Sequence, residues 1–318
     1  MTAKERAKER AKDDGRECVS IVIPVRNRPE LVVRCLESVA RQSWRPLRVI
    51  VVDNNSSDST PQAVERFFAT HPDPGITYTL LHEEKPGACA ARNRGLGAVD
   101  TRMVSFFDSD DAMRPSLVSD AMSLSEGADI VSWECVVNSP DGSQSVKSRL
   151  RGDIMRRQMF NAFFRTQAYM VDADFLRRAG GWREDASVWN DWELGIRLLL
   201  NRPRHRHVAR ILTDIYPQPV SITGTAFSKK AGEWEHTLSV VEEYVADSPD
   251  CRRLKEMIDY RRVVLAAIYR REGARGQAER LLRTTLQSTT CSPARKLLLR
   301  LIYRYTAAGG RAAYLLWK

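Results

Sequence analysis

Three carboxylates stand close together after two aromatic residues, in the segment FFDSDD at residues 106–111. Hard divalent cations such as Mg²⁺ and Mn²⁺ take oxygen ligands, and one or two carboxylates commonly share them with substrate phosphates. Asp108 and Asp110 are therefore candidate metal ligands. Taken alone, the segment is explained equally well by the hydrogen bonding that Asp and Ser give a loop at the end of a strand.

Polar residues also follow two earlier apolar runs. Asp53 comes directly after the run 49–52, and Pro24, Val25 and Arg28 follow the first run. Ligands of open α/β sheets bind beyond the carboxyl ends of the strands. We therefore expect these residues and the acidic segment to lie at one ligand-binding edge.

The elements that must position these residues are short β-branched runs alternating with segments of helical period. Strands are predicted near 19–23, 47–52, 76–81 and 103–107. One helix is predicted over 29–39 and another over 88–99. Between them, a helix is predicted to begin with Thr60 as its cap and Pro61 inside it. This pattern predicts an α/β fold, a doubly wound and mostly parallel sheet with helices on both faces.

The pattern weakens after about residue 136, and from residue 233 onward only helices are predicted. Breaks are expected at 248–249, 273–276 and 292–293, where Ser, Pro and Gly stand. The predicted domains are a charged tail at 1–17, a catalytic domain at 18–230 and a basic helical region at 231–318.

Charge and composition restrict the partners. The 318 residues carry 50 basic and 40 acidic side chains, a net charge of +10, and much of the excess lies after residue 250. This bias favours an anionic partner. The absence of a long apolar run or a secretory signal, together with six scattered cysteines, predicts a cytoplasmic protein with reduced thiols.

The segment ARKLLLRLIYRYTAAGGRAAYLLWK at 294–318 interleaves basic and apolar residues. Such a helix can lie in the interface of an anionic membrane, which would make the protein peripheral on the inner face of the cell membrane. A helix packed on the rest of the protein, with its charges solvated, explains the same pattern.

Four strings carry a resemblance to a known family: SIVIPVRNR, VIVVDNNSSDST, KPGACAARNRGL and FFDSDD. Their order and spacing resemble the family 2 glycosyltransferases of the GT-A fold, from about Val19 to Ile222. The resemblance implies transfer of a sugar, with inversion, from a nucleotide-diphosphate sugar to a glycan or lipid-linked acceptor. It further implies Mg²⁺ or Mn²⁺ as cofactor, and no nucleic-acid partner is expected.

The resemblance also implies roles for residues near the nucleotide. Pro24 and Val25 line the base pocket, and Asp53 hydrogen-bonds the base. A carboxylate accepts a hydrogen bond from an imide N–H such as that of uracil, which favours UDP. Arg28 and Arg92 would bind the diphosphate, because a planar guanidinium can hold phosphate oxygens bidentately.

The acidic triplet Asp108, Ser109 and Asp110 belongs to the same implied donor site. In this family the first aspartate contacts the ribose or metal region, and Asp110 coordinates the metal that bridges both phosphates. That metal neutralises the leaving nucleoside diphosphate. Lys85 and Gly87 stand in a loop that either closes over the phosphates or is a plain turn.

An inverting transfer needs a base for the acceptor hydroxyl. In the family it belongs to a Glu-Asp motif, and Asp191 takes its position here, with Glu193 as the alternative. Asn190 replaces the usual glutamate. Many relatives also carry a histidine before the stretch that corresponds to Ser221–Thr223. This chain has none there, so either Gln218 or water would complete the metal shell, or the dependence on metal would be looser than is usual in the family.

Two other functions stay open. A nucleotidyltransferase also binds nucleotides with metal at strand ends, although it would carry a glycine-rich loop after its first strand, which this chain lacks. A non-catalytic scaffold that binds nucleotides or polyanions would explain Asn190 and the missing histidine. The joint presence of Asp53, Asp108, Asp110 and Asp191 argues for the enzyme.

Overall fold

The computed structural model describes residues 16–218 and 226–317, which form two compact units. The first unit contains the residues up to Gly152, Phe163–Asp185 and Asn201–Pro217. The second contains Asp153–Ala162, Ala186–Leu200 and the residues from Gln218 onward. The predicted domain division at 17 and 230 stays a prediction, since the compact units group the chain by its contacts instead.

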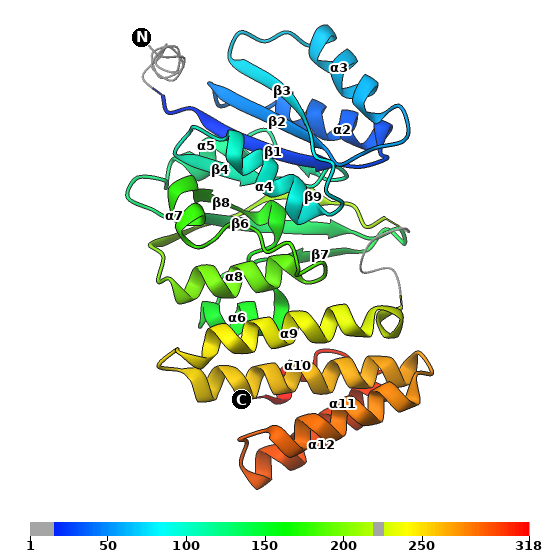
Figure 1. The fold of residues 1–318 in the computed structure, drawn as a ribbon. Helices are drawn as coiled ribbons and strands as arrows, with labels where there is room; N and C mark the ends of the chain where they lie inside the picture. The colour runs from blue at the N-terminus through cyan, green and yellow to red at the C-terminus, as the bar shows by residue number, and fades with distance from the viewer. Residues whose placement is uncertain (1–15, 219–225, 318) are drawn as a thin grey trace. The chain divides into compact units, whose positions relative to one another are not determined.

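The first unit is built on one sheet in the order β3-β2-β1-β4-β8-β6-β9-β5, with β7 paired to β6 (Figure 1). Strands β1 to β4 are parallel, and β8 joins β4 antiparallel. The four predicted strands are confirmed, whereas the sequence pattern did not predict the strands after β4. Their bounds are β1 Val19–Val25, β2 Leu47–Asp53, β3 Ile76–His82, β4 Met103–Phe106, β5 Ala112–Met113, β6 Ile130–Asn138, β7 Gln144–Lys147, β8 Tyr169–Asp172 and β9 His205–Ile215.

Helices cover both faces of the parallel part of this sheet. Side chains of a strand alternate between its faces, and Ile21 of β1 packs in one core with Val32 of α2. Val22 points to the other face, where a Cβ on Gly95 of α4 would lie 2.3 Å from its Cγ1. The predicted doubly wound α/β fold is confirmed. The helices are α2 Pro29–Ala40, α3 Thr60–Thr70, α4 Ala88–Ala98, α5 Leu117–Met122 and α7 Ala173–Arg178.

The predicted cap of α3 is wrong by one residue. Ser59 occupies the N-cap position, and Thr60 is the first helical residue. The Thr60 hydroxyl instead accepts a hydrogen bond from the Arg28 backbone N–H at 2.8 Å and bonds Asp58. Its side chain thus ties the loop after β1 to the loop after β2.

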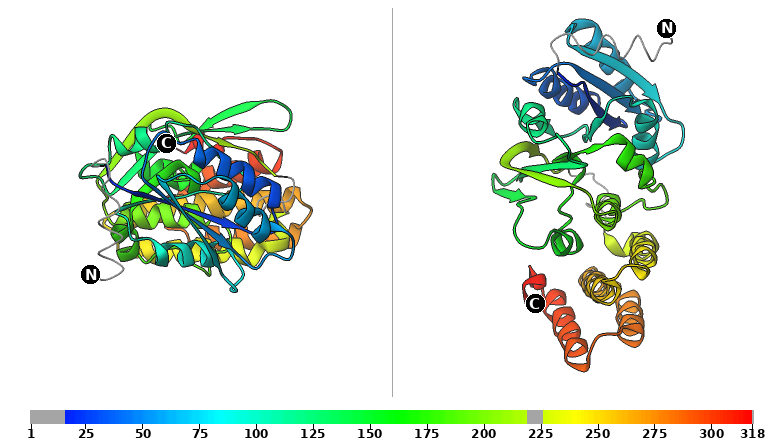
Figure 2. Two further views of the ribbon diagram at one scale, coloured as in Figure 1. Left: turned by 90° about the horizontal axis from the view of Figure 1, so that it is seen from above. Right: turned by 90° about the vertical axis from the view of Figure 1, so that its left-hand side faces the viewer.

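The second unit is helical, and the predicted C-terminal helices and breaks are confirmed. α10 packs against α9, α11 and α12 (Figures 1 and 2). In the described residues, no helix combines the length and the apolar content needed to cross a membrane. The bounds are α6 Ile154–Asn161, α8 Asn190–Leu200, α9 Ala231–Ala246, α10 Cys251–Arg271, α11 Arg275–Ser288 and α12 Pro293–Ala307.

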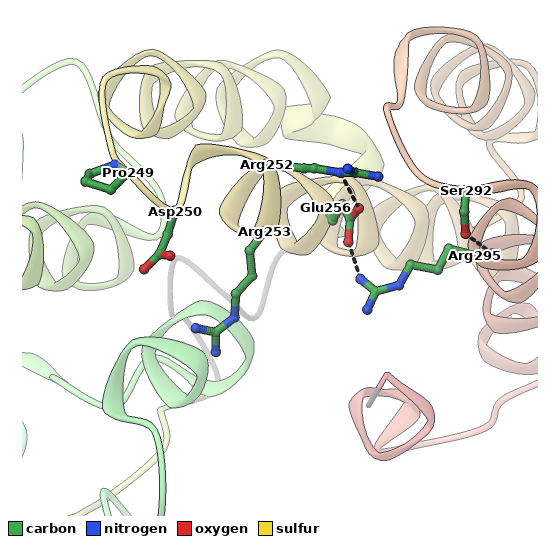
Figure 3. Close-up of a pocket in the computed structure, with 7 residues that line it drawn as sticks. All are labelled: Pro249, Asp250, Arg252, Arg253, Glu256, Ser292 and Arg295. Atoms are coloured by element: carbon green, nitrogen blue, oxygen red, sulfur yellow. Dashed lines mark hydrogen bonds and ion pairs between the residues drawn. The ribbon is translucent and has the colours of Figure 1, made fainter.

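A carboxylate on α10 joins two helices of this unit. Glu256 is buried and forms ion pairs with Arg252 of its own helix and with Arg295 of α12 (Figure 3). The Ser292 hydroxyl caps α12 by accepting from the Arg295 backbone N–H. These side chains line a pocket of about 470 Å³ that also includes Arg253. The ion pairs hold the start of α12 against α10.

Candidate active site

The predicted strand-end residues meet at one edge of the sheet. In the parallel register Val25 lies opposite Asp53, and Val22 lies opposite Phe106. The Phe107 N–H donates to the Val22 carbonyl at 2.9 Å, so the acidic loop begins beside the last half of β1. Parallel pairing therefore brings together the ends of three strands that are distant in the sequence.

Asp53 is a buried carboxylate, and its two oxygens differ in their hydrogen bonding within the described residues. Its Oδ2 accepts from the Ser56 backbone N–H at 3.2 Å and lies 3.2 Å from Nδ1 of His82. Its Oδ1 is buried and has no hydrogen-bond partner in the described part of the chain. A buried acceptor without a partner is costly, so a ligand N–H here would be favourable. His82, which ends β3 in register with Asp53, is a site residue that the sequence pattern did not reveal.

The loop with Lys85 and Gly87 is held by Asn54, a side chain that was not among the predicted site residues. Asn54 donates to the carbonyls of Glu83 and Lys85 at 3.0 and 2.7 Å and accepts from the Gly87 N–H at 2.8 Å. The Lys85 ammonium pairs with Glu184 at 2.5 Å. The loop is thus fastened to the end of β2.

Both predicted arginines pair with the acidic triplet. Arg92, whose side chain is 6% exposed, donates from Nη2 to Asp108 Oδ1 at 2.8 Å and lies over the Trp182 ring at 4.4 Å. Arg28 Nη1 lies 2.8 Å from Asp110 Oδ2. The site therefore holds alternating positive and negative groups, which suits a ligand that carries both phosphates and a cation.

Asp111, the third carboxylate, faces inward. It is 2% exposed and accepts from the Tyr216 backbone N–H at 2.9 Å and from the Gln167 amide. Burial, and then the charges of Asp108 and Asp110, raise its pKa well above the ordinary value. Asp111 therefore anchors the loop and leaves the two preceding carboxylates to face a ligand.

The residues present fit a divalent cation that binds together with a phosphorylated ligand. Among the described residues, no group of three or more His, Cys, Asp or Glu side chains forms a metal cage. Burial and the like charge of Asp108 raise the pKa of Asp110, and a cation would relieve that repulsion. Mg²⁺ is commonly held by one or two carboxylates plus substrate phosphates.

The histidines of β9 are structural. His205 and His207 both hydrogen-bond the Ser132 hydroxyl, at 2.7 and 2.8 Å, and burial lowers the pKa of His205 to about 4. They therefore do not replace the histidine that the family resemblance leads one to expect. The stretch Ser221–Thr223 lies outside the described residues, while Gln218 is the last described residue before it.

Asp191 belongs to the second unit, in the first turn of α8. Its Oδ1 accepts from the Trp192 backbone N–H at 2.8 Å. The buried Gln158 of α6 donates to the carbonyls of Asp191 and Trp192 at 3.2 and 3.0 Å. A carboxylate at a helix N-terminus is stabilised in its charged form by the helix dipole, which suits a base.

An arginine from α10 lies against two tryptophan rings that stand on either side of this carboxylate in the sequence. The Arg261 guanidinium lies 4.5 Å from the Trp189 ring centroid and 4.3 Å from that of Trp192. Burial lowers the pKa of Arg261 to about 10, and the Asp191 charge opposes this shift. Its Nη1 has no hydrogen-bond partner within the described residues. The two rings thus hold a cation that interacts electrostatically with the candidate base.

The backbone before Asp191 is held in an unusual conformation. Trp189 has a φ of +50°, a left-handed conformation that costs a residue with a bulky side chain on the order of 1–3 kcal/mol. Its ring packs on Trp234 of α9 at 4.7 Å, besides its contact with Arg261 of α10. Helices α9 and α10 therefore stabilise the turn that presents Asp191.

Glu193, the alternative base, is fully buried in a bidentate ion pair with Arg197, at 2.7 and 2.9 Å. This geometry gives it a structural role. Of the five aromatic residues at positions 133, 169, 182, 189 and 192, four are buried, and Trp189 is half-buried. The four buried ones are Trp133, Tyr169, Trp182 and Trp192.

The structure thus gathers the predicted donor-site residues in the first unit, whereas Asp191 belongs to the second. The gathered residues are Pro24, Val25, Arg28, Asp53, Arg92, Asp108, Ser109 and Asp110. Neither Asn54 nor Arg261 is among the predicted residues. Asn54 stands beside Asp53 at a strand end, a position that could have marked it, whereas no local pattern points to Arg261.

The chain resembles curated proteins and solved structures. It is 31% identical over 120 residues to the GalNAc(5)-diNAcBac-PP-undecaprenol β-1,3-glucosyltransferase of Campylobacter jejuni, covering 37% of this chain and 38% of that protein. In general the chain spans about a third of the length of the curated relatives it matches.

Two solved structures share the fold. S. aureus TarS 1-349 in complex with UDP-GlcNAc has a TM-score of 0.64 and 16% identity, covering 93% of this chain and 89% of that one. The mannosyltransferase PcManGT from Pyrobaculum calidifontis, in complex with GDP-Man and Mn²⁺, has a TM-score of 0.59 and 19% identity, covering 98% and 89%.

The sequence model of glycosyl transferase family 2 matches residues 20–181, which is just over half of the chain. This range contains every predicted donor-site residue and, apart from Val19, the parallel strands β1 to β4. The chain belongs to glycosyl transferase family 2.

Proposed function

We propose that this chain is a metal-dependent inverting glycosyltransferase. It moves a sugar from a nucleotide-diphosphate sugar, with UDP as the favoured nucleotide, to a hydroxyl of a glycan or lipid-linked acceptor, and Asp191 is the base. The observation that carries the proposal is the strand-end edge where Asp53 and the arginine-paired Asp108 and Asp110 meet.

In this proposal Asp53 recognises the nucleotide base by a hydrogen bond. The buried Oδ1 accepts from the imide N–H of uracil, while Ser56 and His82 occupy the other oxygen. Pro24 and Val25 line the pocket beside it. The TarS complex with UDP-GlcNAc supports UDP as nucleotide, and the PcManGT complex makes GDP the first competitor to test.

Donor binding changes the ionic partners of Arg28 and Arg92. Arg28 and Arg92 are held at the triplet by Asp110 and Asp108 and turn to the diphosphate oxygens when the donor arrives. The two carboxylates would then hold Mg²⁺ or Mn²⁺, which supplies positive charge to the departing diphosphate. Asn54 holds the loop that carries Lys85, whose ammonium pairs with Glu184.

Asp191 takes the proton of the acceptor hydroxyl as the oxygen attacks the anomeric carbon from the face opposite the leaving diphosphate. The helix N-terminus and Arg261 both favour its ionised form. The name of the Campylobacter jejuni relative, which contains a PP-undecaprenol acceptor, supports a lipid-linked acceptor here. The six free thiols support a reducing, cytoplasmic setting.

Calorimetric titration of UDP, with and without Mn²⁺, tests the donor site. We expect Mn²⁺ to tighten UDP binding at least about tenfold, since a cation held by Asp108 and Asp110 would attract the phosphates. GDP, TDP and CDP should bind more weakly. If all four nucleotides fail to bind with Mn²⁺ present, the donor site is wrong and a non-catalytic scaffold becomes the better account.

Replacing Arg261 by Met should lower kcat about 10- to 100-fold and leave UDP binding unchanged, because it removes the cation beside the base. The acidic limb of the pH–kcat profile should move to higher pH, since the carboxylate then loses an interaction that favours its charged form. The Arg261→Lys variant, which keeps a positive charge, should return the acidic limb part of the way to its wild-type pH.

The neighbouring Arg262 supplies the control for this variant. Arg262 pairs with Asp259 of its own helix and with Glu242 of α9. The Arg262→Met protein should therefore have a lower unfolding temperature, while the acidic limb of its pH–kcat profile should stay at the wild-type pH. An Arg261→Met protein that folds and keeps the wild-type limb would remove Arg261 from the mechanism, whereas the UDP titration would still stand.

A further inference from the structure

The C-terminal segment exposes apolar side chains in a regular row. On α12, Leu297, Leu301 and Tyr305 follow each other at intervals of four and are 56%, 50% and 46% exposed. Leu315 and Leu316 are 63% and 50% exposed. These are five of the seven exposed large hydrophobic side chains in the described chain, and the row lies on one helix face.

The opposite face of α12 is already covered. Leu299 and Ile302 are fully buried against Tyr260 and Val263 of α10, in the same cluster as Trp317. The helix therefore needs no further packing to be stable within its unit. The exposed row, which we call the outer α12 face, is apolar surface beyond what the fold requires.

Two contacts fix how this segment is presented. Arg295 pairs with Glu256 of α10, as Figure 3 shows, and Arg156 of α6 donates to the Trp317 carbonyl. The Tyr305 hydroxyl donates to the Arg311 carbonyl at 3.1 Å, so the row leads into the turn before Leu315. The outer α12 face belongs to a segment pinned at both ends.

A basic row runs beside the apolar one. Lys296, Arg300 and Arg304 precede Leu297, Leu301 and Tyr305 by one residue each, and Arg311 follows in the turn. Residues 293–317 contain no Asp or Glu. An apolar row flanked by cations suits a surface with acyl chains below anionic headgroups, because long basic side chains can reach the headgroups while leucines enter the boundary.

We propose that the outer α12 face, with Leu315 and Leu316, docks on the surface of an anionic lipid bilayer. The cations supply the attraction to the headgroups, and the leucines supply the apolar area that enters the acyl boundary. This docking goes beyond the proposed catalytic function and requires no nucleotide. The proposal combines the two interpretations of residues 294–318, a packed helix and a membrane-surface helix, because one face of α12 packs on α10 and the other docks on the bilayer.

Flotation with vesicles tests this docking on the full chain. We expect binding to phosphatidylcholine vesicles that contain phosphatidylglycerol, little binding to phosphatidylcholine alone, and weaker binding at high salt. Arg300→Gln with Arg304→Gln should weaken binding roughly 30-fold, from about 1 kcal/mol per cation. Leu297→Gln with Leu301→Gln should weaken it at least about tenfold.

Two exposed leucines of the first unit give a matched control. Leu124 and Leu150 are 38% and 40% exposed, and replacing both by Gln should leave flotation unchanged. All four altered leucines are on the surface, so unfolding temperature and UDP binding should match the wild type. These readouts separate a failure of docking from a failure of the donor site.

Three results would overturn the proposal. One is the absence of flotation with anionic vesicles. Another is binding that the arginine variant loses and the leucine variant keeps, since that pattern indicates a simple polyanion site. The third is a dimer in light scattering that the leucine variant abolishes while flotation persists, which would assign the outer α12 face to a second copy of the chain.

Discussion

The Asp191→Asn protein should bind UDP as tightly as the wild type and transfer sugar about 10²- to 10⁴-fold more slowly, the range typical of a lost general base. Asn keeps the shape of the side chain and an oxygen that can accept the Trp192 N–H, which Asp191 accepts at 2.8 Å. Only the ability to take a proton is removed. The measurement is kcat with saturating donor and acceptor, beside calorimetric UDP titration.

Asp185 offers a matched carboxylate for this experiment. It stands a few residues earlier and forms an ion pair with Arg183 at 2.6 Å, with its side chain 48% exposed. Asp185→Asn should keep kcat within about twofold, since exposed ion pairs contribute little. If Asp191→Asn turns over normally with donor bound, Asp191 is not the base. The buried Glu193–Arg197 pair makes Glu193 a poor replacement.

The second large effect concerns Asp110. Asp110→Ala should lose the Mn²⁺-dependent gain in UDP affinity and lower kcat at least about 100-fold, because metal stabilisation of a leaving diphosphate contributes several kcal/mol. Stability should change little. Burial and the Asp108 charge already oppose the ionised form of Asp110, and its partner Arg28 is 30% exposed and can turn to solvent.

Asp129 gives the control for Asp110. Both carboxylates pair with an arginine, and their side chains are 15% and 16% exposed. Asp129 precedes β6, and its bonds with Arg204 lower its pKa. Asp129→Ala should therefore lower the unfolding temperature at neutral pH and keep the UDP titration intact. An Asp110→Ala protein with wild-type Mn²⁺ dependence would show that the cation binds elsewhere.

The donor-site part of this protein follows from local sequence. Apolar β-branched runs predict the parallel strands, and parallel strands end at a common edge. The amino-acid order alone therefore suffices to assign Asp53, Asp108 and Asp110 to one site, because their position relative to a strand end is a local property. The breaks between the C-terminal helices are local for the same reason, since Gly and Pro act on the backbone near them.

The pairings within the site depend on tertiary structure. Arg28 and Arg92 could be expected near phosphates, but only the packing of α4 on the sheet brings Arg92 to Asp108 and over Trp182. The inward turn of Asp111 is equally invisible in a row of three acidic residues. Charge alone does not say which carboxylate is buried.

Arg261 and α12 make the same point for the second unit. Arg261 reaches the Trp189 and Trp192 rings on either side of the candidate base because α10 packs on α6 and α9, which in turn contact α8, and no spacing rule links residues so far apart in the chain. The leucines of α12 are alike in sequence, yet Leu299 is buried and Leu297 is exposed. Local periodicity determines that this segment is a helix with apolar faces, while the position of α10 decides which face is covered and which is free to dock.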